Sequence, residues 1–245
     1  MYILLLSDFK SLMLRLKTIE IDTACEVMNY HLLSLTPIDR NLLIKPVRAL
    51  HEKWFEITAV KDARLQEVRN YLKFFEEFSV NLVKTLMHSV DANGNNVLHY
   101  VYGNSRFDLA EELLRSGHAT NLLNKLNKSG NSPLMICATS KPKTESDWFV
   151  IQKTIQLGDV NASSPFNNQT PLMHAASWGS HGMVRLLLDA GADPNFQDKD
   201  GSTALMYAAA HGHIVCARML LEHPNCDPSI KDCVRETFLL LYKML

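Results

Sequence analysis

Residues 198–213 read DKDGSTALMYAAAHGH, and the centre of this pattern occurs three more times upstream. The copies are GNNVLHY at 94–100, GNSPLMI at 130–136, NQTPLMH at 168–174 and GSTALMY at 201–207. They share leucines that are 36, 38 and 33 residues apart, and a weaker copy, RETFL at 235–239, follows 34 residues later. Self-similarity at such a period indicates stacked structural repeats rather than one continuous globular core.

Each position of the pattern has a structural explanation. Glycine at 94, 130 and 201 can adopt a positive φ in a tight turn. Serine or threonine at 132, 170, 203 and 237 can cap a following helix, and Pro133 and Pro171 suit its first turn. Leucines at helical spacing predict a second helix in each unit, ended by glycine at 117, 158 and 191. A turn followed by two helices, repeated about every 33 residues, is typical of ankyrin repeats.

The sequence therefore predicts an all-α fold, an ankyrin repeat solenoid with four clear repeats, a truncated fifth and an N-terminal helical cap. Repeats begin at about 91, 127, 165 and 198, with a partial repeat from 232. Upstream, apolar spacing predicts helices over 8–33, 40–58 and 61–88, with breaks at Pro37 and Pro46. We assign 61–245 to the repeat domain, with 61–90 as its capping helix, and 1–60 to a helical extension. The alternative is a separate helical domain with its own activity.

Composition narrows the classes of function. The net charge is −1 and the pI about 6.8, which argues against nucleic acid as a partner. Five cysteines without Cys-x-x-Cys spacing are typical of buried thiols in a reducing compartment. No signal-peptide pattern or long uncharged apolar run occurs, so we expect a cytoplasmic, monomeric protein without membrane insertion.

The chain carries no known catalytic or phosphate-binding motif, so we predict no enzyme activity, no cofactor, no metal site and no catalytic residue. The pair His211 and His213 could suggest a metal site, but we expect these side chains to make structural hydrogen bonds in a turn. Asp198 and Asp200 are expected to accept hydrogen bonds from the backbone of their turn or to face a basic partner. Cys137 falls at a helix-packing position, where it lacks access to a substrate.

The repeat geometry predicts a binding surface. In an ankyrin stack the turns and the outer side of the first helices line a concave face. The outward positions are the second, fifth and sixth residues after each shared leucine. Tyrosine and tryptophan at such positions are typical of protein-binding hot spots, although each ring could instead pack on a neighbouring turn. The candidate partner-binding residues are Tyr100, Gly103, Asn104, Ile136, Thr139, Ser140, His174, Ser177, Trp178, Tyr207 and His211.

Four segments resemble one family in particular. EKWFEI at 52–57, VDANGNNVLHY at 90–100, LGDVNA at 157–162 and DKDGSTALMYAAAHGH at 198–213 are similar to the ankyrin domain of the Kank proteins. The resemblance implies a scaffold of the cytoskeleton that binds a helical peptide from a kinesin-type motor and acts on actin and microtubules at the cell cortex. It also implies a binding role for Tyr100. The chain departs from the family at Gly103, His174, Trp178 and Ala210, which leaves the identity of the peptide open. The alternative is a generic ankyrin adaptor that recruits a client protein to a regulatory complex.

Overall fold

The computed structural model describes residues 24–28, 40–78 and 80–233, which fall in two compact units, Met1–Ser89 and Val90–Leu245. The regular structure of these described residues is helical throughout, without strands. The first unit contains α3 (Arg40–Thr58), α4 (Leu65–Phe78) and α5 (Val80–Met87), and residues 24–28 are also helical. Its core includes the fully buried Trp54 and Phe75, whose ring centroids lie 6.4 Å apart at an edge-to-face angle.

Two predictions for the first unit are corrected. Pro46 lies inside α3 and does not break it, although its missing N–H removes one hydrogen bond of the helix. The single helix predicted over 61–88 is two helices, α4 and α5, which pack against each other. Periodicity misses this break because the buried positions, from Val68 in α4 to Leu82 in α5, keep helical spacing across it. Most of the helix predicted over 8–33, and Pro37, lie outside the described residues.

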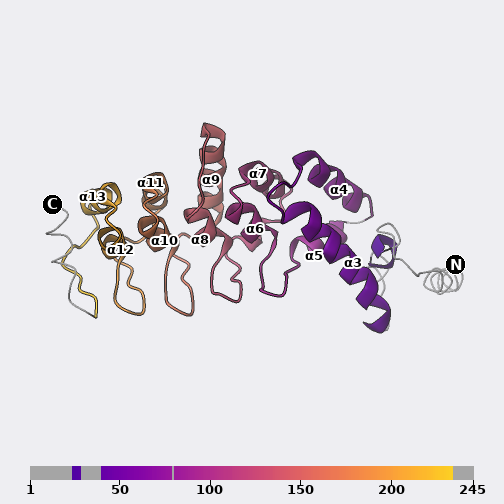
Figure 1. Cartoon of the computed structure of the whole chain (residues 1–245), viewed down its shortest axis with the longest axis horizontal. Helices are drawn as coiled ribbons and strands as arrows, with labels where there is room; N and C mark the ends of the chain where they lie inside the picture. Colours follow the sequence, from indigo (N-terminus) through magenta and orange to yellow (C-terminus); the bar gives the residue numbers. More distant parts are fainter. Residues whose placement is uncertain (1–23, 29–39, 79, 234–245) are drawn as a thin grey trace, which may run out of the picture. The chain divides into compact units, whose positions relative to one another are not determined.

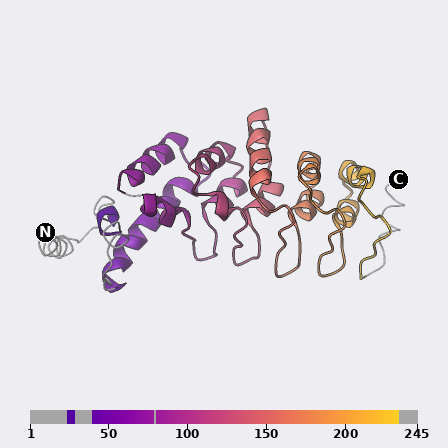
Figure 2. The same cartoon turned by 180° about the vertical axis from the view of Figure 1, so that it is seen from behind.

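The second unit is a row of four helix pairs (Figure 1). In Figure 1 the second helices lie above the first helices, and the turns that precede the first helices project below; Figure 2 shows the same layers from behind. A short 3₁₀ turn, η1 (Thr120–Leu122), follows the first pair. The pairs, called repeats 1 to 4 below, are α6 (Val97–Gly103) with α7 (Phe107–Arg115), α8 (Pro133–Ala138) with α9 (Glu145–Leu157), α10 (Pro171–Ser177) with α11 (His181–Asp189), and α12 (Ala204–Ala210) with α13 (Ile214–Glu222).

The predicted caps begin the first helices. Ser132 accepts a hydrogen bond from the N–H of Met135 at 3.2 Å, and Thr170 accepts one from Met173 at 3.4 Å. Thr203 is the N-cap of α12, and proline occupies the first position of both α8 and α10. These caps satisfy amide groups that the first turn leaves without partners, so the short first helices start at defined residues. The cap predicted at Thr237 and the copy at 235–239 lie outside the described residues.

The turns before the first helices, which we call fingers 1 to 4, span residues 91–96, 127–132, 164–170 and 198–203. Gly94, Gly130 and Gly201 have φ of 76°, 77° and 80°, and Asn168 takes the same place in finger 3 with φ 62°. A positive φ is readily adopted by glycine and tolerated by asparagine, so all four fingers can make the same sharp turn. Finger 3 contains one residue more than the others, because Ser164 bonds to Gln169, whereas Asp91 bonds to Asn95.

Repeat 2 is larger than its neighbours. Six residues connect α8 to α9, against three in each of the other repeats, and α9 has 13 residues where the other second helices have 9. Gly117 and Gly191 follow the second helices with positive φ as predicted, but Gly158 after α9 is extended, with φ −93°. Glycine is required at position 158 for a steric reason, because a Cβ would lie 2.8 Å from the side chain of Leu134.

Candidate protein-binding surface

Ten of the eleven candidate residues are at least partly accessible. Gly103, Trp178 and His211 are exposed, and Tyr100, Asn104, Ile136, Thr139, His174, Ser177 and Tyr207 are partly exposed. Ser140 is the exception: it is buried, and its hydroxyl donates to the carbonyl of Cys137 at 2.6 Å. Repeat 2 continues after Ser140 into its long connection, which covers the position that is open in other repeats. Ser140 is therefore a packing residue rather than part of an outer surface.

The two candidate tyrosines are tied to the fingers. The hydroxyl of Tyr100 donates to Asp91 at 2.5 Å, and that of Tyr207 donates to Asp198 at 2.7 Å. The Tyr207 oxygen also accepts from Gln169 of the preceding finger at 2.5 Å. The hydroxyl groups of both tyrosines are therefore bonded to a turn, which is the alternative stated in the sequence analysis. Only the exposed parts of the rings are available to a partner.

These contacts change the titration of the groups involved. Burial and the Asp198 carboxylate raise the pKa of Tyr207 to about 12. Partial burial alone would raise the pKa of Asp91, but hydrogen bonds from Tyr100 and from Asn95 outweigh it and lower the pKa. Asp91 therefore stays ionised and keeps finger 1 attached to α6 at neutral pH.

His174 occupies the equivalent place in repeat 3 without such a partner. Finger 3 begins with Ser164 where the other fingers have Asp91, Asn127 or Asp198. The Nε2 atom of His174 is buried and has no hydrogen-bond partner among the described residues. Burial lowers the pKa of His174, so its ring is neutral at neutral pH. Repeat 3 thus lacks the link from helix to finger that repeats 1 and 4 have.

Exposed aromatic rings gather around repeats 2 and 3. Of the described Phe and Trp side chains, the ones more than half exposed are Phe149, Phe166 and Trp178, at 63%, 61% and 61%. The indole N–H of Trp178 has no acceptor within the part of the chain that the structure describes. Tryptophan is among the residues enriched in protein-binding hot spots, which makes Trp178 the strongest candidate of the three.

Trp178 also borders a groove of about 290 Å³. The groove lies between residues 139–142, which follow α8, and residues 178–182, which form the connection after α10 and the first two residues of α11. Trp148 of α9 lines it as well. Trp148 is a site residue that the sequence analysis missed. It packs on Gly182, where a Cβ would overlap the indole ring. The 38-residue interval between Leu134 and Leu172 was the available signal, since it marked an insertion just before this tryptophan.

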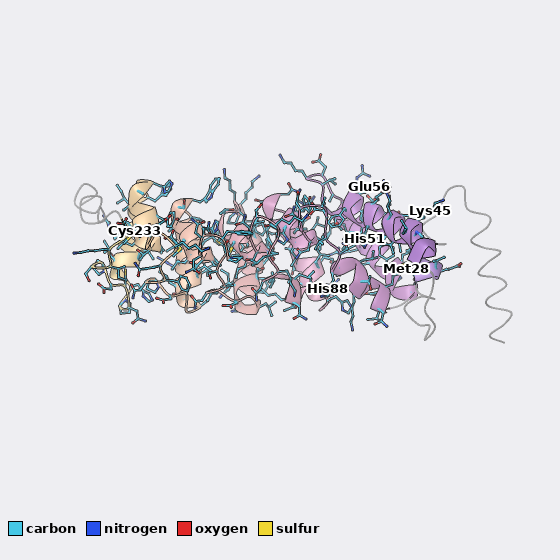
Figure 3. The ribbon with its side chains drawn as sticks, turned by 90° about the horizontal axis from the view of Figure 1, so that it is seen from below. Met28, Lys45, His51, Glu56, His88 and Cys233 are labelled. Atoms are coloured by element: carbon cyan, nitrogen blue, oxygen red, sulfur yellow. The ribbon has the colours of Figure 1, made fainter. Side chains whose placement is uncertain are left out.

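The contacts between fingers are interrupted at the same junction. The N–H of Lys128 donates to Asn93 at 2.8 Å, that of Lys199 to Asn167 at 3.0 Å, and that of Cys233 to Asp200 at 2.9 Å. Cys233, labelled in Figure 3, is the last of the described residues. Between fingers 2 and 3 the donor position is Pro165, which has no N–H, and no backbone hydrogen bond joins these two fingers among the described residues. The ring of Phe166 lies against Gly130 instead.

A second row of contacts, in the loops after the second helices, is complete. The side chain of Asn161 accepts from the N–H of Asp193 at 2.9 Å and donates to the carbonyl of Gly191 at 3.1 Å. Asn195 makes the same pair of bonds to the next loop, with Asn225 and Asp227 at 2.6 and 2.7 Å. The stack is therefore continuous between repeats 2 and 3, although their fingers are not bonded.

The residues first considered for chemistry have structural partners. His213 contacts the carbonyl of Ser177 in repeat 3 through Nε2 at 3.0 Å, and His211 contacts the carbonyl of Tyr207 through Nδ1 at 2.9 Å. Asp198 is buried and accepts from two backbone N–H groups of finger 4, as predicted. Burial raises the pKa of Cys137 to about 12, which keeps it a thiol.

The described ranges contain neither a metal-binding cluster nor a membrane-spanning helix. Within them, no cluster of three or more His, Cys, Asp or Glu side chains is placed to hold a metal ion. Within the same ranges, no helix has the length and hydropathy needed to cross a bilayer.

Comparison with known proteins gives related repeats. The family described as "Ankyrin repeats (3 copies)" matches residues 147–232. Rabankyrin-5 of Mus musculus is 42% identical over 66 residues, which are 27% of this chain and 6% of that protein. Neurogenic locus notch homolog protein 1 of Xenopus laevis is 29% identical over 173 residues, or 68% of this chain and 6% of that protein. The chain thus spans a small part of the curated relatives it matches.

A solved structure extends the match beyond the family segment. The ankyrin repeat domain of Bcl-3 superposes with a TM-score of 0.56 at 23% identity, covering 78% of this chain and 92% of that one. At this identity the likeness concerns the fold. Together with the repeated finger and helix pair, it identifies the chain as an all-helical ankyrin repeat domain.

Proposed function

We propose that this chain is a non-catalytic protein-interaction scaffold of the Kank type. It binds a helical peptide of a cytoskeletal partner, a kinesin-type motor, and contributes to actin and microtubule organisation at the cell cortex. The observation that carries the binding role is Trp178, 61% exposed beside a groove, on a line of accessible first-helix positions in four consecutive repeats. The Kank-type partner rests on the resemblance of the four quoted segments.

The recognition mode follows from the repeat surface. An amphipathic helix would lay its apolar residues along the first helices, and the large ring of Trp178 would supply most of the buried apolar area. Tyr100 and Tyr207 would contribute ring edges only, since their hydroxyl groups bind Asp91 and Asp198. The three rings therefore do not contribute equally in this binding mode, and Trp178 is the main anchor.

The organisation of the chain belongs to the same proposal. Residues 61–90 would cap the repeat domain, 61–245, and residues 1–60 would form a helical extension. Support comes from α4 and α5, which are amphipathic and carry the apolar faces that such a cap requires. The absence of catalysis is supported by the family match, which is to a repeat family rather than an enzyme family.

The second candidate is a generic ankyrin adaptor that brings a client protein to a regulatory complex. What favours it is the diversity of the related proteins, since Rabankyrin-5, a Notch homologue and Bcl-3 carry similar repeats under unrelated names. The same groove and the same line of residues would serve either partner. Only the identity of the bound protein differs between the two candidates.

The test uses the full chain and synthetic helical peptides from kinesin-type motors, with affinity measured by calorimetry. Binding by wild type that falls about thirtyfold in Trp178→Ala is expected, because truncating a hot-spot aromatic has an effect of that size. Phe149→Ala, an equally exposed ring on the second helix of repeat 2, is the matched control and should bind normally. No binding of motor peptides, with subunits of a regulatory complex co-purifying instead, would favour the adaptor.

A further inference from the structure

The groove between repeats 2 and 3 has the size of an anchor pocket. Its volume of about 290 Å³ lies at the lower end of the range for small-molecule sites and suits one large side chain. It lies between the connection of repeat 2 and that of repeat 3. The six-residue connection of repeat 2 forms one wall, so the three-residue connections of the other repeats would not build it.

The lining of the groove is suited to an apolar group. Trp148, Trp178 and Pro142 present apolar surface. The hydroxyl of Thr139 donates to Ile136 and that of Ser140 to Cys137, so neither is free to donate to a ligand. An aromatic or leucine side chain would gain stacking and contact area against the two indole rings.

The charges around the groove determine which residues of a bound segment can flank the apolar side chain. Its lining includes Lys141 and His181 and no acidic residue, and Lys143 is exposed nearby. Two carboxylates close to the lining residues in sequence, Glu145 and Asp147, occupy the first turn of α9, where they stabilise the helix N-terminus. Asp147 is further engaged by the N–H groups of residues 143 and 144. The accessible charge of the groove itself is thus positive, which favours acidic neighbours in a bound segment.

Among the described residues, repeats 2 and 3, whose connections form the groove, are joined by hydrogen bonds on one side of the stack only. Pro165 removes the hydrogen bond between fingers, while Asn161 maintains the bonds on the other side of the stack. The groove is continuous with the surface used in the proposed function, since Thr139 and Trp178 belong to both.

We propose that this groove is the anchor pocket for a partner protein segment with one bulky apolar side chain, aromatic or leucine, flanked by aspartate or glutamate. The apolar side chain packs between Trp148 and Trp178, and the flanking carboxylates lie near Lys141. The inference rests on the proposed function, because it needs the chain to bind proteins, and adds where the segment is anchored and which chemistry it carries.

The experiment selects ligands without assuming a partner. A random peptide library displayed on phage is selected on the full wild-type chain, and the enriched peptides are synthesised. Their affinities are measured by tryptophan emission, since Trp148 and Trp178 line the groove and the third tryptophan, Trp54, is fully buried in the first unit. The variants are Trp178→Ala and Lys141→Glu. Phe149→Ala and Arg218→Glu are the matched controls. The second makes the same change of charge at an exposed position of α13.

Enriched peptides should combine a bulky apolar residue with Asp or Glu and shift tryptophan emission to shorter wavelength. Trp178→Ala should weaken them about thirtyfold. Lys141→Glu should weaken them about threefold to tenfold, less at high salt. Peptides that are basic, or that bind both groove variants as well as wild type, would overturn this inference while leaving the binding function intact. Failure of any peptide to enrich over an unrelated protein would count against both.

Discussion

The hydrogen bond between Tyr102 of α6 and Thr154 of α9 allows a quantitative test of how repeats 1 and 2 hold together. Both side chains are fully buried, and their oxygens lie 2.7 Å apart. The Thr154 hydroxyl donates to the carbonyl of Val150 at 2.8 Å, so the Tyr102 hydroxyl is the donor of the pair. Burial raises the pKa of Tyr102 well above its ordinary value, so the group stays protonated.

Removing either partner should have a different cost. Tyr102→Phe removes the donor but leaves Thr154 bonded to Val150, so we expect a loss of about 0.5–1.5 kcal/mol, the net value of one hydrogen bond. Thr154→Val leaves the Tyr102 hydroxyl buried without an acceptor, which costs about 1–3 kcal/mol. In the double variant no polar group is stranded, so its loss should be smaller than the sum of the two.

The assay is urea unfolding of the three variants, followed by circular dichroism and compared at equal m-values. The double-mutant cycle isolates the interaction from the separate effects of each change. Equal destabilisation by the two single variants, or strict additivity in the double variant, would refute the assignment of donor and acceptor and the claim that this bond couples the repeats.

Three further outcomes follow from the described contacts. Asp91 has a lowered pKa, so its stabilisation is complete above the ordinary value of about 3.9 and is lost as pH falls through the folded-state pKa. Tyr100→Phe removes one of its hydrogen bonds, and acid unfolding followed by circular dichroism should then begin at higher pH. Asn195→Ala breaks two bonds to the next loop and should lower stability by about 1–3 kcal/mol in urea, more than a change at an exposed site. Gly201→Ala should lower the melting temperature measured by calorimetry, because its φ of 80° is strained for alanine and its Cβ would lie 3.2 Å from the Cα of Asp232.

Features governed by neighbouring residues could be predicted from the sequence. The cap at Ser132, the proline that follows it and the positive φ of Gly94 depend on a few adjacent residues, and all three match the structure. The period of the leucines also predicts the helix pairs, because each repeat contacts its neighbours in the same way. The capping and turn residues and the repeat period predict the same helix boundaries, so each copy of the pattern supports the others.

Features governed by contacts between repeats could not be predicted in this way. Nothing adjacent to Tyr100 shows that its hydroxyl reaches Asp91, and the burial of Ser140 depends on the connection that follows it. Trp148 was missed because it lies in a second helix, and the candidate positions were counted along the first helices only. Its place in the groove depends on Gly182, 34 residues away in the next repeat.

In the proposed binding mode, the irregular junction is also where the partner finds groups that the stack leaves without hydrogen bonds. In repeats 1 and 4 the second residue after the shared leucine bonds to its finger, and the fingers bond to their neighbours, so these regular contacts consume the available donors. In repeat 2 the same position is Ile136, which has no polar group, and in repeat 3 Pro165 and the serine of finger 3 each remove one such contact. The indole N–H of Trp178 and the imidazole of His174 then remain without partners among the described residues. An ankyrin stack gains stability from repetition, and it gains specificity where repetition is broken.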